Sequence, residues 1–208
     1  MQELGEWKNR HVGETIIVCG NGPSLNTLID AVVASTTIGV NDACYYFEPD
    51  YLVIIDKVKT FIPERQEFIL QAKDVCKAVF CNDPNELYGH FRGGKAEQVL
   101  LRPTVLDPRL SGVMSLRERD KVYTAITSTF TAVTLASVFG ANRIGLAGVD
   151  LIAHEKLSPQ LERLNDSYQL LAHACKQAGI LLLNLSESSL LETVRKGTFS
   201  DLRSAPLP

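Results

Sequence analysis

The chain has 208 residues, of which 45% are hydrophobic and 22% are charged, and its formal net charge is −3. This length suits one large domain with a substantial core, and the slightly acidic balance argues against a broad nucleic-acid or membrane surface. No apolar run approaches the ~20 residues of a membrane span, and residues 1–14 lack a signal-peptide core, so we expect a cytoplasmic protein.

Short apolar runs alternate with helical patterns along the chain, which is typical of a parallel sheet covered on both faces. The expected strands are TIIVCG (15–20), TTIGV (36–40), YLVIID (51–56), KAVFCN (77–82), QVLLRP (98–103), RIGLAG (143–148) and ILLLNL (180–185). The expected helices are 23–34, 128–141, 158–179 and 186–197. We therefore predict an α/β fold in which residues 1–208 form a single three-layer, Rossmann-like domain with a mostly parallel sheet.

Residues 82–122, after the fourth expected strand, are rich in Arg and Pro and show poor periodicity. A stretch this long without strong elements is usually a lid or binding insertion in a compact domain. Its basic residues suit a lid over an anionic ligand, and a solvated loop of balanced charge is the alternative. These residues are Arg92, Lys95, Arg102, Arg109, Arg117 and Arg119. We expect residues 197–208 to form a flexible tail.

The most informative loop is GNGPS, which follows the first strand and opens the first helix. Gly20 and Gly22 permit close approach to the backbone, Asn21 and Ser24 offer side-chain hydrogen bonds, and Pro23 presets the entry into the helix. Free amides beside a helix N-terminus predict a site for an anion such as phosphate. The alternative is a tight turn without a ligand.

Two better-known phosphate loops do not fit this segment. A dinucleotide fingerprint needs a third glycine, where Leu25 stands, and an acid after the second strand, where Asn41 stands. A Walker A loop needs Gly-Lys-Ser/Thr, which does not follow these glycines. The five cysteines are scattered without CxxC spacing, which predicts buried thiols and no zinc site.

Three blocks of the chain resemble, in order and spacing, the bacterial family-42 sialyltransferases and the related 6-hydroxymethylpterin diphosphokinase-like proteins. The first is IIVCGNGPSLN with TTIGVNDACYYFEPDYLVIID, in which an Asn follows the second strand. The second is ITSTFTAVTLASVFGANRIGLAGVDL, a helix and then a strand that ends in Gly-x-Asp. The third is NDSYQLLAHACKQAGILLLNLSESSLL. Together the blocks cover roughly two-thirds of the chain.

The resemblance implies a nucleotide site at the carboxyl edge of the sheet, where open α/β folds bind ligands. The residues that it implies for nucleotide binding are Gly20, Asn21, Gly22, Pro23, Ser24, Asn41, Ser128 and Thr129. Asp150 would face the same crevice from the end of its strand. The tyrosines that follow Gly-x-Asp in the sialyltransferases are absent here, and Tyr123 and Tyr168 are the candidates to replace them.

His154 and Asp150 are the predicted catalytic residues. The resemblance implies that His154 is the general base for the acceptor hydroxyl, and an imidazole suits this work because its ordinary pKa of ~6.5 lies near neutral pH. A solvated loop histidine is the alternative. Asp56 and Asp150 both end strands. They would bind hydroxyls or orient neighbours in a sialyltransferase, or hold Mg²⁺ in a diphosphokinase, and helix capping is their structural alternative.

We therefore predict a nucleotide-dependent transferase, in first place a glycosyltransferase that takes a CMP-linked sugar and needs no metal cofactor. The first alternative is Mg²⁺-dependent diphosphate transfer from ATP, and the second is a nucleotide-binding module without catalysis. The predicted partner is a nucleotide or nucleotide-sugar donor. The sequence does not identify the acceptor, and a homo-oligomer is compatible with it.

Overall fold

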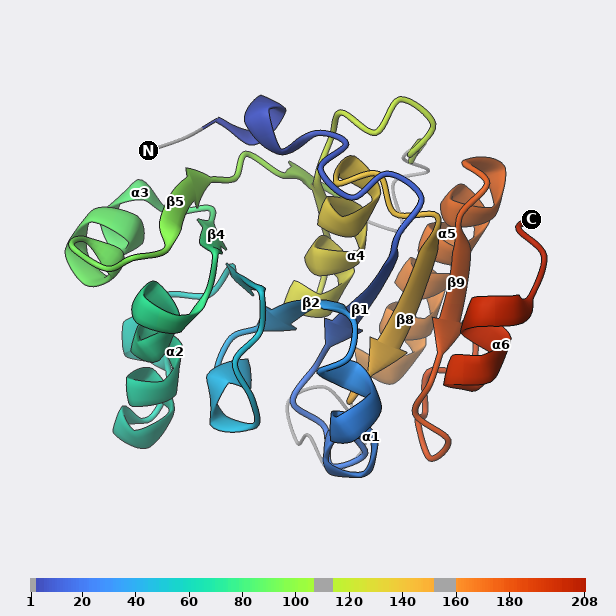
Figure 1. Ribbon diagram of the computed structural model, residues 1–208, viewed down its shortest axis with the longest axis horizontal. Helices are drawn as coiled ribbons and strands as arrows, with labels where there is room; N and C mark the ends of the chain where they lie inside the picture. The colour runs from blue at the N-terminus through green and yellow to red at the C-terminus, as the bar shows by residue number, and fades with distance from the viewer. Residues whose placement is uncertain (1–2, 107–113, 152–159) are drawn as a thin grey trace.

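The computed structural model describes residues 3–106, 114–151 and 160–208, which form helices on both sides of a central sheet (Figure 1). The main sheet contains β1 (Thr15–Cys19), β2 (Thr36–Val40), β3 (Tyr51–Ile54), β4 (Ala78–Cys81), β5 (Glu97–Leu100), β8 (Arg143–Ala147) and β9 (Leu181–Asn184). A small second sheet pairs β6 (Thr104–Val105) with β7 (Tyr123–Thr124). The α-helices are α1 (Leu25–Val32), α2 (Pro63–Val75), α3 (Pro84–Glu86), α4 (Ser128–Val138), α5 (Leu161–Gln177) and α6 (Phe199–Ser204). Short helical turns are η1 (Leu4–Trp7), η2 (Ala43–Tyr45), η3 (Val58–Thr60) and η4 (Leu87–Phe91).

The strand order of the main sheet is β5-β4-β3-β2-β1-β8-β9, and every described pair is parallel. From β1 the chain moves outward to β5, and it then returns through α4 to place β8 on the other side of β1. The direction of winding therefore reverses between β1 and β8. In open α/β sheets such a reversal leaves a crevice beyond the carboxyl ends of the two strands.

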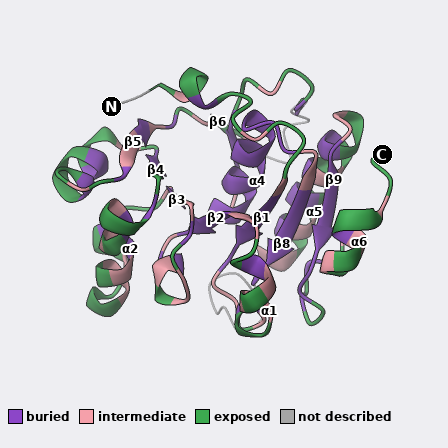
Figure 2. Cartoon of the chain, in the orientation of Figure 1, coloured by how far each residue is buried: buried purple, intermediate pink, exposed green. Residues whose placement is uncertain are grey.

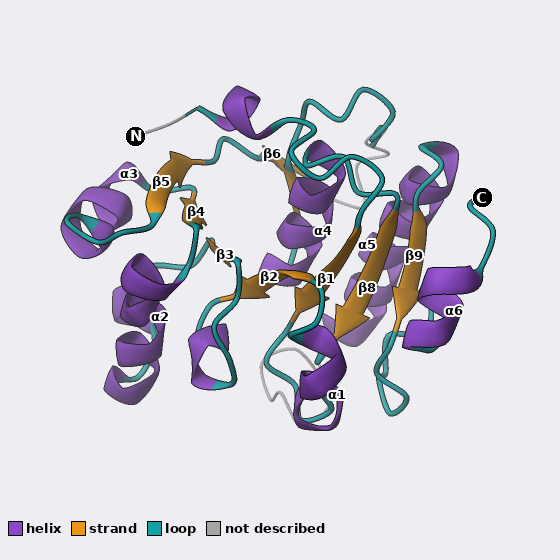
Figure 3. Cartoon of the chain, viewed as in Figure 1, coloured by secondary structure: helices purple, strands orange, loops and turns teal. Residues whose placement is uncertain are grey.

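Figure 3 shows helices on both faces of the main sheet. Alternate side chains along each strand pack against the helices on one face or the other. Ile16 and Val18 of β1 pack with α4 and α5, whereas Ile17 and Cys19 pack with α1 and α6 on the opposite face. The helix α2 covers the same face as α1, farther along the sheet, over β3 and β4. The predicted three-layer, Rossmann-like α/β fold is thus confirmed.

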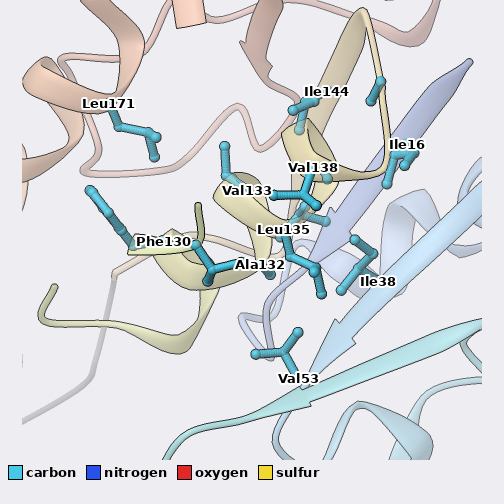
Figure 4. Close-up of a cluster of buried hydrophobic side chains, with 14 of the residues drawn as sticks. Ile16, Ile38, Val53, Phe130, Ala132, Val133, Leu135, Val138, Ile144 and Leu171 are labelled. Atoms are coloured by element: carbon cyan, nitrogen blue, oxygen red, sulfur yellow. The ribbon is translucent and has the colours of Figure 1, made fainter. Parts of the chain in front are cut away.

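The central helix is α4, which is buried along its whole length (Figure 2). Its apolar side chains lie against Ile16, Ile38 and Val53 of the sheet and reach Leu171 of α5 (Figure 4). Its buried hydroxyls are satisfied locally, since Thr134 donates to the carbonyl of Tyr123 at 3.1 Å. A helix that is enclosed on all sides holds its N-terminus in a fixed place.

The structure corrects three features of the sequence interpretation. Residues 186–197 are not a helix, and Asn165 of α5 holds this segment by accepting the amide of Glu192 at 2.9 Å. Residues 197–208, expected to be a flexible tail, contain α6, which begins at a capping box between Thr198 and Asp201 and buries Leu202.

The third correction is α2, which the sequence interpretation missed. This helix begins with proline at its first position, and its buried positions are only Ile69 and Ala72, so its apolar periodicity is weak.

Within the expected insertion 82–122, β5 pairs with β4 and so belongs to the main sheet. None of the helices in the described part of the chain is both long and apolar enough for a bilayer crossing.

Asp50 joins the starts of three neighbouring strands. Its carboxylate accepts the amide of Thr37 at 2.9 Å and pairs with Lys77 at 2.7 Å. Burial alone would raise the pKa of Asp50, but the hydrogen bonds from Lys77 and Thr37 outweigh it and hold the pKa below its usual value. A lowered folded-state pKa means that the stabilisation is present above the unfolded pKa of ~3.9 and is lost as the pH falls through the folded value.

We expect Asp50→Asn to lower the free energy of unfolding at pH 7 by about 1–3 kcal/mol, because charge-assisted hydrogen bonds are lost. The difference from the wild-type chain should shrink as the pH falls below about 4. Urea denaturation across this pH range measures both effects, with exposed Asp166→Asn as the matched control. A deficit that stays constant down to pH 2 would contradict the role of the ionised carboxylate.

Candidate functional site

A cavity of about 460 Å³ opens beyond the carboxyl ends of β1, β2 and β8, at the point where the sheet reverses its winding. It is lined by residues 20–23, 40–42, 127–129 and 148–151, together with Tyr46 and Arg65. The predicted site residues gathered in its wall are Gly20, Asn21, Gly22, Pro23, Asn41, Ser128, Thr129 and Asp150. Asp56 is not part of this wall, and His154 lies outside the described residues.

The glycine loop is closed against the end of β8. The amide of Gly20 donates to Ala147 O, and the amide of Gly22 donates to Gly148 O, both at 2.8 Å. A Cβ atom on Gly22 would lie 2.5 Å from a carboxylate oxygen of Asp150. These glycines therefore allow two loops of the chain to approach each other, and their amides are not free for a phosphate as the sequence interpretation expected.

Asp150 stands where that phosphate was expected. It is 1% exposed, and its carboxylate accepts both the amide of Ser24, at 2.7 Å, and the hydroxyl of Ser24. Ser186 Oγ lies 2.7 Å from Ser24 Oγ and accepts the amide of Gly148 at 3.0 Å. The carboxylate thus supplies the negative charge that the start of α1 attracts. Its described contacts are those of a residue that joins the β1 and β8 loops.

The start of α4 is open by comparison. Thr127 is the N-cap, and its hydroxyl accepts the amide of Phe130 at 3.3 Å. Within the described parts of the chain, the amides of Ser128 and Thr129 have no hydrogen-bond acceptor. The hydroxyl of Ser128 donates to Asn41 Oδ1 at 3.3 Å. Two amides and the positive end of a buried helix therefore border the cavity.

Tyr168 supports this helix start from behind. Its hydroxyl lies 3.0 Å from Thr127 Oγ1 and 2.6 Å from Thr129 Oγ1, and burial raises the pKa of Tyr168. Tyr123 is turned elsewhere and donates to the carbonyl of Ser115 at 3.2 Å. Neither tyrosine lines the cavity, so neither replaces the family tyrosines there. The tyrosine that does line it is Tyr46, whose pKa is raised by burial and by the nearby carboxylate of Asp42.

The sequence interpretation also missed an ion pair in the cavity wall. Arg65 of α2 donates to both carboxylate oxygens of Asp42, from Nε at 2.6 Å and from Nη2 at 2.5 Å. Asn21 donates to the same carboxylate at 2.6 Å. Arg65 brings the cavity a cation from a helix that the apolar pattern did not reveal. Pro63, which stands at the first position of α2, was the available signal for that helix.

Two residues of the wall have left-handed backbone, at Asn41 (φ 53°) and Leu151 (φ 56°). Asparagine tolerates this region, but leucine adopts it rarely and at a cost of about 1–3 kcal/mol. Backbone strain of this kind gathers at ligand sites because the surrounding structure holds it in place. Asn41 directly follows the end of β2, and Leu151 directly follows the Gly-x-Asp turn after β8.

In the diphosphokinase alternative, Asp56 and Asp150 would hold Mg²⁺ together. Asp150 is held by Ser24, and Asp56 lies outside the cavity wall. Across the described ranges, no three His, Cys, Asp or Glu side chains group in a way that could hold a metal ion. Of the basic residues expected in a lid, those that the structure describes do not line the cavity, and Arg109 lies outside the described residues.

We expect Gly22→Ala to lower the free energy of unfolding by about 1–3 kcal/mol, because the added methyl group meets Asp150 and the carbonyl of Gly148. Gly89→Ala makes the same chemical change where no atom lies within 4 Å, so it should leave stability unchanged or raise it by up to about 1 kcal/mol, because alanine reduces the freedom of the unfolded chain. Urea denaturation of both variants measures the difference. Equal effects in the two variants would show that the β1 and β8 loops do not need this close contact.

No protein-family model and no curated protein matches the chain. Among solved structures, the MAf glycosyltransferase from Magnetospirillum magneticum AMB-1 matches 98% of this chain with a TM-score of 0.59 and 15% identity. This chain spans 38% of the length of that protein.

The sialyltransferase CstII from Campylobacter jejuni matches in two complexes, both at a TM-score of 0.52. In the complex with cytidine-5′-monophosphate the identity is 17%, over 89% of this chain and 85% of CstII. In the complex with the substrate analogue CMP-3FNeuAc it is 16%, over 88% and 84%. At these identities the likeness is one of fold, and this chain has the Rossmann-like α/β fold of these glycosyltransferases.

Proposed function

We propose that this protein is a glycosyltransferase that takes its sugar from a nucleotide-activated donor, with a CMP-linked sugar as the first candidate. The observation that carries the proposal is the start of α4, where the amides of Ser128 and Thr129 border the cavity at the reversal of the sheet. The fold likeness to two glycosyltransferases supports it, and one of them is described in complex with CMP and with a CMP-sugar analogue.

In this proposal the phosphate of the donor lies at the start of α4. Negative charge develops on that phosphate as the bond to the sugar breaks, and fixed amides at a helix N-terminus stabilise it without reorganisation. The Ser128 hydroxyl donates to Asn41 Oδ1 in the structure and would have to turn from it to add a third donor from the same turn. Tyr168 and Thr127 hold this turn in position, and the enclosure of α4 in the core keeps it rigid.

The acceptor hydroxyl needs a base, and we propose His154 for this role, as the resemblance to the sialyltransferases implies. Asp150 takes a different part from the catalytic one first predicted. Because its carboxylate is committed to Ser24, we assign it to the closure of the loops that shape the cavity. In this proposal, none of the residues named here has to hold a metal ion for the sugar to be transferred.

The first alternative, diphosphate transfer from ATP, finds no specific support in the cavity. It requires carboxylates that share Mg²⁺, and Asp56 does not line the cavity while Asp150 is hydrogen-bonded within the protein. The second alternative, a nucleotide-binding module, is an outcome of the experiments below.

We expect CMP and CMP-sialic acid to raise the melting temperature with or without Mg²⁺. A ligand at ~100 times its Kd adds ~2.7 kcal/mol, which is roughly 5–10 °C for a chain of this size. A thermal-shift panel that also includes UDP, GDP and ATP, each with Mg²⁺ or with EDTA, measures this. A shift that requires both ATP and Mg²⁺ would reverse the proposal in favour of diphosphate transfer.

We expect His154→Ala to lower sugar transfer by about 10²-fold or more, because the acceptor loses its general base, while CMP affinity stays within about twofold. The matched control is His173→Ala on the exposed side of α5, which should keep full activity. Transfer is measured as CMP release in EDTA with a mixture of candidate acceptor sugars. Binding without turnover in the wild-type chain would identify a binding module instead of an enzyme.

A further inference from the structure

Besides the positive N-terminus of α4, the cavity wall contains a cationic side chain, Arg65, which comes from a helix on the opposite face of the sheet. The helix α4 belongs to the core on one face, and α2, which carries Arg65, belongs to the core on the other. Both helices contribute to the cavity wall, α4 through its first turn and α2 through Arg65. A ligand between them meets a helix N-terminus on one side and a guanidinium on the other.

Arg65 is held in one orientation. Its Nε and Nη2 atoms donate to the two oxygens of Asp42, whose side chain is only 11% exposed and also accepts from Asn21. The ring of Phe61 lies 4.9 Å from the guanidinium carbon. Such bidentate pairing fixes the plane of the guanidinium as well as its position.

Arg65 has N–H donors that the pairing with Asp42 does not use. A guanidinium carries five N–H donors, and the two bonds to Asp42 leave three of them. The side chain is 39% exposed, and the residue borders the cavity. Hydrogen bonding to Asp42 raises the pKa of Arg65, so the group stays charged at any working pH. It is therefore a fixed cation with donors to spare, and planar or tetrahedral oxyanions match its geometry.

We infer that Arg65 binds a second anionic group of the donor, while the first phosphate lies at the start of α4. The inference rests on the proposed function and narrows its substrate class to donors with two oxyanions. The second oxyanion is either a carboxylate on the transferred sugar or a second phosphate of the nucleotide. Neutral sugars linked through a single phosphate lack a partner for Arg65 and are the disfavoured donors.

The test compares the affinities of CMP, CDP and CMP-sialic acid by titration calorimetry in the wild-type chain, Arg65→Gln, Arg65→Lys and the exposed control Arg92→Gln. We expect the wild-type chain to bind at least one of the two larger ligands ten times more tightly than CMP. Arg65→Gln should remove that gain and leave the CMP affinity within about twofold. Arg65→Lys should retain part of it, because the charge remains but the fork is lost.

The arms of the experiment separate the outcomes. A gain with CMP-sialic acid that depends on Arg65 identifies a sugar carboxylate, and one with CDP identifies a second phosphate. An equal loss for all three ligands in Arg65→Gln would overturn the inference, because Arg65 would then bind the common phosphate or support the fold. A wild-type gain that survives in Arg65→Gln would overturn it as well.

Failure of the wild-type chain to bind any of the three ligands counts against the proposed function itself. Urea denaturation checks that each variant is folded. If Arg65→Gln does not fold, the affinities of Arg65→Lys are compared with those of the wild-type chain instead.

Discussion

The bond between Ser24 and Asp150 is the contact on which the site depends. These residues are 126 positions apart, yet the amide and hydroxyl of Ser24 both reach the Asp150 carboxylate. A parallel sheet that reverses its winding leaves its central loops apart at the carboxyl edge. Here a buried charge at the start of α1, satisfied by two donors, draws them together. The absence of a side chain at Gly22 makes room for that carboxylate. The cavity lies between these joined β1 and β8 loops and the start of α4.

This closure decides which helix is open to a ligand. Both α1 and α4 begin at the same edge of the sheet, and both have a positive N-terminal end. The protein itself fills the first with Asp150, so the second is left for an outside anion. Because α4 is enclosed by the sheet and by α5, packing holds its first turn in place. Tyr168 adds to this rigidity, since its hydroxyl contacts Thr127 and Thr129 from the protein side. Polar groups that border the cavity are thus carried by a helix that is buried along its whole length.

Much of the fold could be predicted because the buried strands appear in the sequence as short apolar runs such as TIIVCG, and α4 appears as a longer stretch of small and apolar residues, TAVTLASV, closed by a glycine. The location of the site followed from the same pattern, since polar residues after strand ends meet at one edge. The partners of those residues could not be predicted. Ser24 and Asp150 were each assigned to a ligand because nothing in either loop indicates that they bond to each other. Arg65 was missed because α2 buries only Ile69 and Ala72, and its meeting with Asp42 depends on how α2 packs beside η2. In residues 186–197, Leu191 and Val194 are buried and Leu190 is exposed, and a hydrogen bond from the amide of Glu192 to Asn165 holds the segment in an irregular path.

The enclosure of α4 also constrains the order in which the chain can fold. This helix covers β1, β2 and β3, but it is synthesised after β5, so the strands leave the ribosome well before their main cover. Ile16, Ile38 and Val53 remain without it for that time. Contacts between such distant segments form slowly because a long loop must close first. During that interval the exposed strand face is open to association with other chains. The late synthesis of α4 therefore leaves the nascent chain with an apolar strand face that the finished protein buries.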